Sequence, residues 1–231
     1  MLELNQIGID YDAPDGVATA VASMSLNLAR GEIVCLTGPS GSGKSSVLRA
    51  IAGFEPIARG CIRIADEVVS TPEGLVAPEC RSVGLVFQDY ALFPHLTAVQ
   101  NIGFGLRKLD ADARTRRVTQ LLEVVGLQSC ARKYPHEMSG GQQQRIALAR
   151  ALAPAPRLLL LDEPFSSLDE MTRLNLVTQV RSILKQSGCT ALAVTHDHEE
   201  ARAFGDRTVA MPNPSRVQPS PDPFPARAAY A

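Results

Sequence analysis

The chain has 231 residues, of which 45% are hydrophobic and 20% are charged, and its 23 Lys and Arg against 24 Asp and Glu give a formal net charge of −1. This composition is ordinary for a soluble globular protein with one large domain or two small ones. The balanced charge argues against a protein that works by general attraction to nucleic acid or to anionic lipid.

The five cysteines include no C-x-x-C pair and no Cys/His cluster, which speaks against a zinc site and fits a reducing compartment. The first residues lack a basic segment followed by an apolar stretch, so no signal peptide is expected. The longest aliphatic run covers residues 158–161, far below the roughly 20 residues that span a bilayer. We therefore expect any membrane role to come through a partner.

The predicted elements alternate between strands and helices along the chain. Strands are predicted over residues 2–9, 24–28, 32–37, 61–64, 83–87, 157–161 and 190–195. Helices are predicted over residues 44–51, 110–125, 139–152, 168–186 and 197–204. This alternation predicts an α/β fold with a mainly parallel sheet and helices packed around it. The segment 211–231 holds six prolines, so we expect residues 212–231 to be an extended or disordered tail after a domain over 2–211.

A glycine-rich segment links the strand predicted over 32–37 to the helix predicted over 44–51. It fits the pattern G-x-x-x-x-G-K-[ST] and comprises Gly38, Pro39, Ser40, Gly41, Ser42, Gly43, Lys44 and Ser45. Glycine lets backbone N–H groups approach anionic oxygens, and the helix that follows directs its positive end at them. Lys44 is expected to contact the β- and γ-phosphates of a nucleotide, and the Ser45 hydroxyl to bind Mg²⁺.

The strand predicted over 157–161 runs into two acidic residues, Asp162 and Glu163. On its own, this pattern marks a strand that ends in solvated carboxylates as often as it marks a metal or catalytic site. After a phosphate-binding loop, however, Asp162 is expected to hold Mg²⁺ directly or through water. Glu163 lies one residue further on, where a carboxylate can orient and deprotonate an attacking water.

Residues 138–142 form a third motif, Met-Ser-Gly-Gly-Gln, at the start of a predicted helix. Ser139 and Gln142 fit a capping box, which explains these two residues. It leaves Gly140 and Gly141 unexplained, because each glycine in a helix costs about 1 kcal/mol against alanine. Exposed N–H groups at a helix start form a second anion site. Two phosphate-facing loops that lie far apart in the sequence predict a nucleotide shared between two copies of the chain.

With these motifs in this order, the sequence resembles the ATP-binding subunits of ABC transporters over residues 2–211, with Met138 in place of the usual leucine of the signature. The resemblance implies a P-loop NTPase domain with a RecA-like core, an antiparallel β subdomain and a helical signature subdomain over about residues 89–155. It also implies that Gln88 senses Mg²⁺ and the permease, and that His196 contacts the γ-phosphate. Tyr11 would stack on adenine, and residues 167–169 match the D-loop.

By this resemblance, the expected cofactors are ATP and Mg²⁺. The expected catalytic residues are Lys44, Glu163 and His196, and the expected metal ligands are Ser45, Gln88 and Asp162. The residues expected to contact the nucleotide are Tyr11, Gly38, Pro39, Ser40, Gly41, Ser42, Gly43, Lys44, Ser45, Ser46, Gln88, Ser139, Gly140, Gly141, Gln142 and Asp169.

The resemblance further implies a homodimer with shared nucleotide sites, bound to two transmembrane permease subunits at the cytoplasmic face of the bacterial inner membrane. An external substrate-binding protein would be an indirect partner, and no nucleic acid is expected. Residues 86–96 and 139–145 are similar to bacterial importer ATPases, and residues 76–81 together with the pair Asp89-Tyr90 favour iron(III) importers among them. Polyamine, sulfate, molybdate and sugar importers are the alternatives. The apolar residues Tyr90, Leu92 and Phe93 are predicted to form an exposed partner surface.

Two other classes of protein compete with a transport ATPase. A soluble ABC ATPase of DNA repair would carry a long coiled coil, and one of translation would carry two cassettes, whereas the sequence has neither. A nucleotide-binding regulator without turnover would not need Lys44, Asp162, Glu163 and His196 together. Importer ATPases of this group usually continue into a small regulatory β-domain, so the proline-rich tail puts regulation through such a domain in doubt.

Overall fold

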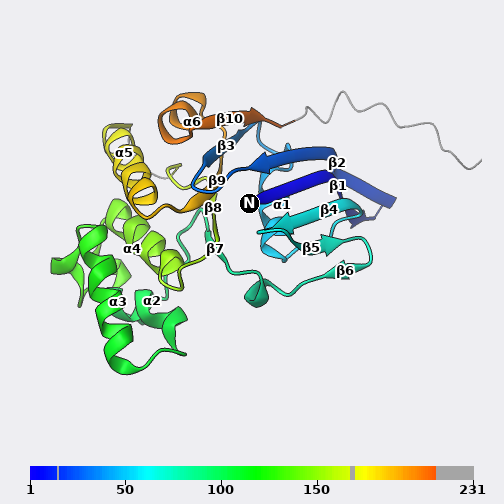
Figure 1. Ribbon diagram of the computed structural model, residues 1–231. Helices are drawn as coiled ribbons and strands as arrows, with labels where there is room; N and C mark the ends of the chain where they lie inside the picture. The colour runs from blue at the N-terminus through cyan, green and yellow to red at the C-terminus, as the bar shows by residue number, and fades with distance from the viewer. Residues whose placement is uncertain (15, 167–169, 212–231) are drawn as a thin grey trace, which may run out of the picture.

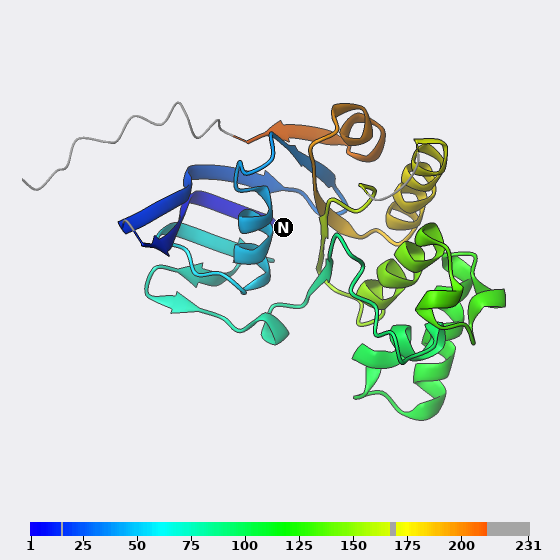
Figure 2. The ribbon, with the colours of Figure 1, turned by 180° about the vertical axis from the view of Figure 1, so that it is seen from behind.

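The structure is a computed structural model that describes residues 1–14, 16–166 and 170–211, apart from the side chains of residues 170–172. It contains two five-stranded sheets and a group of helices. In Figure 1 the antiparallel sheet lies on the right, the helices α2 to α4 lie at the lower left, and the parallel sheet runs between them. Figure 2 shows the same order from behind. None of the helices in the described ranges has the length and apolar character needed to cross a membrane.

The parallel sheet has the strand order β10-β3-β9-β8-β7. Its members are β3 (Ile33–Thr37), β7 (Val83–Val86), β8 (Leu158–Asp162), β9 (Thr190–Thr195) and β10 (Arg207–Ala210). All residues of β3 and β9 are buried, and four of the five in β8 are, because helices or the second sheet cover both faces. Alternate side chains of each strand therefore enter two different cores, as Leu159 and Leu160 do.

The second sheet is antiparallel and has the order β2-β1-β4-β5-β6. Its strands are β1 (Leu2–Ala13), β2 (Gly16–Leu28), β4 (Arg59–Ile64), β5 (Glu67–Thr71) and β6 (Gly74–Leu75). Strand periodicity predicted only parts of β1, β2 and β4, and neither β5 nor β6. The parallel sheet predicted from periodicity is therefore one of two sheets, and the antiparallel subdomain was implied only by the family resemblance.

Six α-helices complete the described chain: α1 (Lys44–Ala52), α2 (Ala98–Gly103), α3 (Ala111–Val124), α4 (Gly140–Leu152), α5 (Glu170–Gln186) and α6 (His198–Phe204). Four short 3₁₀ helices, η1 to η4, cover Pro78–Cys80, Phe104–Leu106, Gln128–Cys130 and Pro135–Glu137. Helix α1 packs between the two sheets, whereas α2 to α5 share a core with the opposite face of the parallel sheet. The phosphate-binding loop thus starts α1 at the junction of both sheets.

A buried arginine closes the other end of α1. The Arg81 side chain is 3% exposed and donates to the carbonyl oxygens of Ala50 and Ile51, both at 2.9 Å, and to three further acceptors around β5. The Ala50 carbonyl oxygen also accepts from the Gly53 amide at 3.2 Å, and carbonyls in the last turn of a helix carry its negative dipole end, so a cation suits this end of α1. A Cβ at Gly53 would lie 2.5 Å from Arg81 Nε, which explains the glycine at the C-cap.

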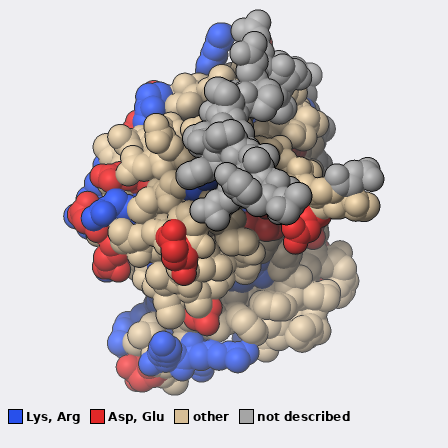
Figure 3. All heavy atoms as spheres, turned by 90° about the vertical axis from the view of Figure 1, so that its right-hand side faces the viewer, with Lys and Arg blue, Asp and Glu red and all other residues tan. Residues whose placement is uncertain are grey.

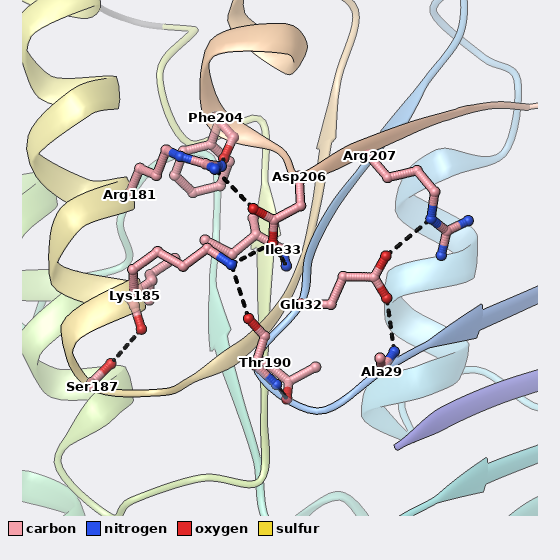
Figure 4. A network of polar contacts seen from close by, with 12 residues as sticks. Ala29, Glu32, Ile33, Arg181, Lys185, Ser187, Thr190, Phe204, Asp206 and Arg207 are labelled. Atoms are coloured by element: carbon pink, nitrogen blue, oxygen red, sulfur yellow. Dashed lines mark hydrogen bonds and ion pairs between the residues drawn. The ribbon is translucent and has the colours of Figure 1, made fainter.

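Asp206 joins three elements at the amino-terminal edge of the parallel sheet (Figure 4). Its carboxylate accepts hydrogen bonds from the Ile33 amide at 2.9 Å, from Arg181 Nη2 at 2.8 Å and from Lys185. Burial alone would raise the pKa of Asp206, but these donors hold it at about 2. Next to this group, Arg207 Nε donates to Glu32 at 3.0 Å. The network fastens α5 and the start of β10 to β3.

Candidate functional site

The glycine-rich loop lies between β3 and α1, pressed against β2. Gly41 and Gly43 have φ values of 78° and 89°, in the left-handed region that favours glycine. A Cβ added at Gly43 would lie 2.7 Å from the Ala20 carbonyl oxygen. The loop therefore needs a glycine at position 43 both for its backbone conformation and for its contact with β2.

The loop gathers hydrogen-bond donors in a confined space. The Lys44 side chain is buried, and its Nζ donates to the carbonyl oxygens of Gly38 and Pro39, both at 2.9 Å. The Ser42 hydroxyl is buried and has no hydrogen-bond partner among the described residues. The first amides of α1 have no acceptor within the helix. These groups fit the phosphate oxygens of a nucleoside triphosphate, because these oxygens accept hydrogen bonds from an ammonium group, a hydroxyl and backbone N–H groups.

Ser45 and Asp162 meet across the start of α1 and the end of β8. Ser45 Oγ donates to Asp162 Oδ1 at 2.9 Å. Burial raises the pKa of Asp162, the hydrogen bond from Ser45 opposes this, and the nearby Glu163 charge adds to it. A hydroxyl and a carboxylate are hard oxygen donors of the type that Mg²⁺ prefers, so this pair fits the expected metal.

Glu163 and His196 lie side by side at the ends of β8 and β9. Glu163 Oε2 is 3.3 Å from His196 Nδ1, and the Glu163 amide donates to the Val194 carbonyl oxygen at 3.0 Å. Glu163 has a φ of 43°, a conformation that costs a non-glycine residue about 1–3 kcal/mol when it lies in a sparsely populated region. Such strain persists where the surrounding structure imposes it, and here it occurs at the expected general base.

Two further predicted residues reach this region from neighbouring elements. Gln88 follows β7, and its Nε2 donates to Ser166 Oγ at 3.5 Å. Ser166 in turn donates to the Glu163 carbonyl oxygen at 3.0 Å, which ties Gln88 to the segment after β8. The Tyr11 hydroxyl of β1 donates to Ser46 Oγ of α1 at 2.9 Å, beside the phosphate-binding loop.

The signature motif forms the helix start that the sequence predicts. Ser139 is the N-cap of α4, the Gln142 amide donates to its hydroxyl at 3.4 Å, and the Gln142 side chain accepts from the Ser139 amide at 3.1 Å. Among the described residues, no hydrogen bond links this motif to the phosphate-binding loop, to Asp162 or to Glu163. Gly140 is exposed. The expected D-loop, with Asp169, lies outside the described residues.

The predicted exposed surface after Gln88 is wrong for Tyr90, which is 6% exposed and belongs to the helical core. The reason is the turn that contains it: Tyr90 and Ala91 have φ values of 61° and 43°, and this turn places the Tyr90 side chain among the packed residues of the helical core. Leu92 is partly buried against the same core, and the Phe93 ring lies 4.3 Å from that of Phe104.

Three residues near the site were not identified from the sequence. Ser166 carries no local signal, and its contacts with Gln88 and Glu163 arise only from the fold. Asp197 carries one, because Asp before a helix is a typical N-cap. Arg173 lies on α5 and pairs with Asp197 at 3.2 Å, a contact between distant segments that no local pattern indicates.

The family model that describes ABC transporters matches residues 21–166. The chain belongs to this family. Among relatives, the spermidine/putrescine import ATP-binding protein PotA of Pseudomonas fluorescens is 44% identical over 91% of this chain and 58% of its own length. The Fe(3+) ions import ATP-binding protein FbpC 2 of Rhizobium meliloti is 48% identical over 83% of this chain and 48% of its own. The resemblance to importer ATPases is thereby confirmed.

The sulfate/thiosulfate import ATP-binding protein CysA 2 of Chromobacterium violaceum is 46% identical over 90% of this chain and 56% of its own length. The chain thus spans about half the length of the curated relatives it matches. Among solved structures, the ATP-binding cassette MJ0796, a dimer bound to ADP and Pi, superposes with a TM-score of 0.78 at 32% identity, over 91% of this chain and 94% of that one. The fold predicted from the resemblance is thereby confirmed.

Proposed function

We propose that this chain is the ATP-hydrolysing subunit of a bacterial ABC importer and powers uptake across the cytoplasmic membrane. The observation that carries the proposal is the convergence of Lys44, Ser45, Asp162, Glu163 and His196 at the carboxyl-terminal edge of the parallel sheet. The import ATP-binding relatives named above support the direction of transport.

Each of these groups has a chemical task in the proposed reaction. Lys44 and the loop amides would bind the triphosphate, and Ser45, Asp162 and Gln88 would hold Mg²⁺, which would neutralise phosphate charge. Glu163 orients and deprotonates the attacking water. His196 contacts the γ-phosphate and keeps Glu163 in place through the 3.3 Å contact. Tyr11 packs against the adenine, and the Tyr11 hydroxyl donates to Ser46 Oγ.

The signature motif supports a shared site. Because Ser139 to Gln142 make no described hydrogen bond to the phosphate-binding loop of their own chain, we propose that they bind the γ-phosphate of a second copy. Asp169 would join the same interface. The dimeric cassette among the structural relatives supports this arrangement.

A Glu163→Gln substitution tests the proposed hydrolysis and the shared site together. The amide keeps the shape of the side chain but cannot accept the proton, so ATP should bind without being cleaved. Two trapped nucleotides then hold the dimer, which size-exclusion chromatography with Mg-ATP would detect. Wild-type activity should rise faster than linearly with protein concentration. A variant that stays monomeric in saturating ATP, with wild-type activity strictly proportional to concentration, would exclude the shared-site mechanism.

A groove between α2, η2 and α3 is the surface that we propose for the two permease subunits. Its volume is about 580 Å³, and it is lined by apolar side chains, with Val99 and Phe104 each 38% exposed, and by the cations Arg107 and Arg114. On the face in Figure 3, Lys and Arg side chains gather at the lower end, at the height of α2 and α3 in Figure 1. An amphipathic permease segment with an acidic edge fits such a groove.

A pair of substitutions tests this groove. Phe104→Glu should cut substrate uptake while basal ATPase activity stays unchanged, because the groove lies outside the nucleotide site. Val124→Glu is the matched control, since Val124 is 41% exposed on α3 but does not line the groove. Normal uptake by the Phe104 variant would remove the groove as the permease contact.

We further propose iron(III) as the cargo, with the chain peripheral at the cytoplasmic face of the inner membrane. The support is the pattern of residues 76–81 together with several relatives named as Fe(3+) importers. Relatives named for polyamine and sulfate import have similar identity, so cargo must be assigned by experiment. Purifying the chain from membranes with its permease and measuring uptake of labelled iron, spermidine and sulfate in a deletion strain would decide between them.

A further inference from the structure

The His196 imidazole has little around it to fix its direction. The side chain is 55% exposed, and its ion-pair contact among the described residues joins Nδ1 to Glu163 Oε2 at 3.3 Å. An exposed side chain rotates freely among its rotamers unless neighbouring groups restrict it. The position of the imidazole therefore depends on how firmly the backbone on either side of His196 is held.

Asp197 holds that backbone from both directions. Its amide donates to Thr195 Oγ1 at 3.1 Å, which closes a tight turn around His196. Its carboxylate oxygen Oδ1 accepts from the amides of Glu199 and Glu200 at 2.8 and 3.1 Å, and so caps α6. The hydrogen bond from the Glu200 amide is the main cause that lowers the pKa of Asp197. Asp197 is therefore a charged group at the centre of the turn.

Arg173 connects this turn to α5. Its Nη1 lies 3.2 Å from Asp197 Oδ2, the carboxylate oxygen that the cap does not use. The two side chains are 28% and 32% exposed, so water only partly screens the pair. Arg173 lies in the first turn of α5, the helix that follows Glu163 in the chain, whereas Asp197 follows β9. The pair thus bridges the segment that follows Glu163 and the turn that carries His196.

We infer that Arg173 and Asp197 form a positioning pair that holds the His196 imidazole against Glu163. This inference rests on the proposed roles of Glu163 and His196 in hydrolysis. Neither Arg173 nor Asp197 needs to touch the nucleotide, because the pair acts through the backbone around His196. Its loss should therefore slow turnover and leave ATP binding unchanged.

The same helix offers a matched control two turns further on. Arg181 pairs with Asp206 at 2.8 Å, and the two side chains are 31% and 28% exposed, close to the values of the first pair. This second pair (Figure 4) lies at the amino-terminal edge of the sheet, where Asp206 accepts from the Ile33 amide, whereas His196 follows the carboxyl end of β9. Arg181 also donates to the Phe204 carbonyl oxygen at the far end of α6. Arg181→Met thus removes a comparable ion pair from α5 and leaves the Asp197 contacts around His196 in place.

The decisive experiment is a double-mutant cycle in single-turnover ATP hydrolysis by the purified chain. Arg173→Met should lower the rate about tenfold and leave the KM for ATP unchanged. This loss is smaller than the roughly hundredfold that a misplacement of a reacting group by about 1 Å can cost. In the His196→Ala background the same substitution should have no further effect, because the group that it positions is gone. Arg173→Lys should restore most of the rate, and Arg181→Met should leave the rate of the folded protein unchanged.

The outcomes separate the two proposals. If His196→Ala itself leaves hydrolysis unchanged, the proposed role of His196 fails. If His196→Ala slows hydrolysis but the Arg173→Met effect multiplies with it, the positioning pair is wrong. Asp197→Asn supplies an independent variant, since it keeps the cap and removes the charge. It should reproduce the loss seen with Arg173→Met, and the two together should lose no more than either alone; additive losses would again overturn the inference.

Discussion

The two edges of the parallel sheet differ in how their polar groups are paired. At the carboxyl-terminal edge, the buried Ser42 hydroxyl has no described partner, and Glu163 holds a strained backbone conformation. At the amino-terminal edge, Asp206 accepts from three donors, and Arg207 pairs with Glu32. At the carboxyl-terminal edge, a strained residue and an unpaired hydroxyl therefore lie where a ligand is proposed to bind, whereas the Asp206 network fastens the strands at the other edge.

Helix α5 serves both edges. Arg173 near its start contacts the turn after β9, whereas Arg181 and Lys185 near its end contact Asp206. Substitutions at the two ends of this helix should therefore separate effects on activity from effects on stability. Substitutions of Lys44 at one edge of the sheet and Lys185 at the other should separate them in the same way.

The largest effect is expected for Lys44→Ala at the carboxyl-terminal edge. The substitution removes the ammonium group proposed to bind the β- and γ-phosphates, and a lost charge-stabilising donor costs roughly a hundredfold or more in turnover. Steady-state ATPase measurements and the melting temperature should show lost activity with an intact fold. Lys185→Ala is the control, because it should lower the melting temperature and keep the activity of the folded fraction. Parent-rate hydrolysis by Lys44→Ala would show that the nucleotide site is wrongly assigned.

An intermediate effect is expected for Asp206→Ala at the amino-terminal edge. It leaves Arg181, Lys185 and the Ile33 amide without their acceptor, which should lower the free energy of unfolding by about 2–3 kcal/mol. The pKa of Asp206 is lowered to about 2, so its stabilisation is present above an unfolded pKa near 3.8 and is lost as the pH falls toward 2. Urea titrations between pH 2 and pH 6 should therefore converge for wild type and variant at the acid end; a constant difference would contradict the pairing.

A smaller effect is expected for Glu200, which lies behind the carboxyl-terminal edge. Burial raises the pKa of Glu200 from 4.5 to about 7, partly opposed by a hydrogen bond from Thr195. The native protein thus keeps a proton that the unfolded chain loses, so this stabilisation is complete below pH 4.5 and disappears as the pH rises through 7.

Glu200→Gln removes that dependence and should unfold less readily than wild type at pH 8, by on the order of 1–2 kcal/mol, with the gap closing toward pH 5. Thermal unfolding across this pH range measures it. A pH-independent difference would mean that Glu200 is charged throughout.

Local patterns predicted the parts of this molecule that depend on nearby residues. The glycines of the phosphate-binding loop and the Ser139 capping box follow from sequence spacing, and both have the predicted form. Strand β10 was not predicted, because Arg207 and Thr208 are exposed and leave no apolar run. The inward turn of Tyr90 and the Arg173–Asp197 pair depend on backbone angles and long-range packing, which periodicity does not encode.

The neighbours of β3 in the sheet also determine when this strand can fold during synthesis. Strand β3 pairs only with β9 and β10 within the described sheet. Because β3 ends at residue 37 and β9 begins at residue 190, more than 150 residues are synthesised between β3 and its first partner strand. At about 5–20 residues per second, translation leaves β3 without a sheet neighbour for roughly 10–30 s. The phosphate-binding loop therefore forms late, and a nascent chain that ends before β9 has no assembled site that could hydrolyse ATP.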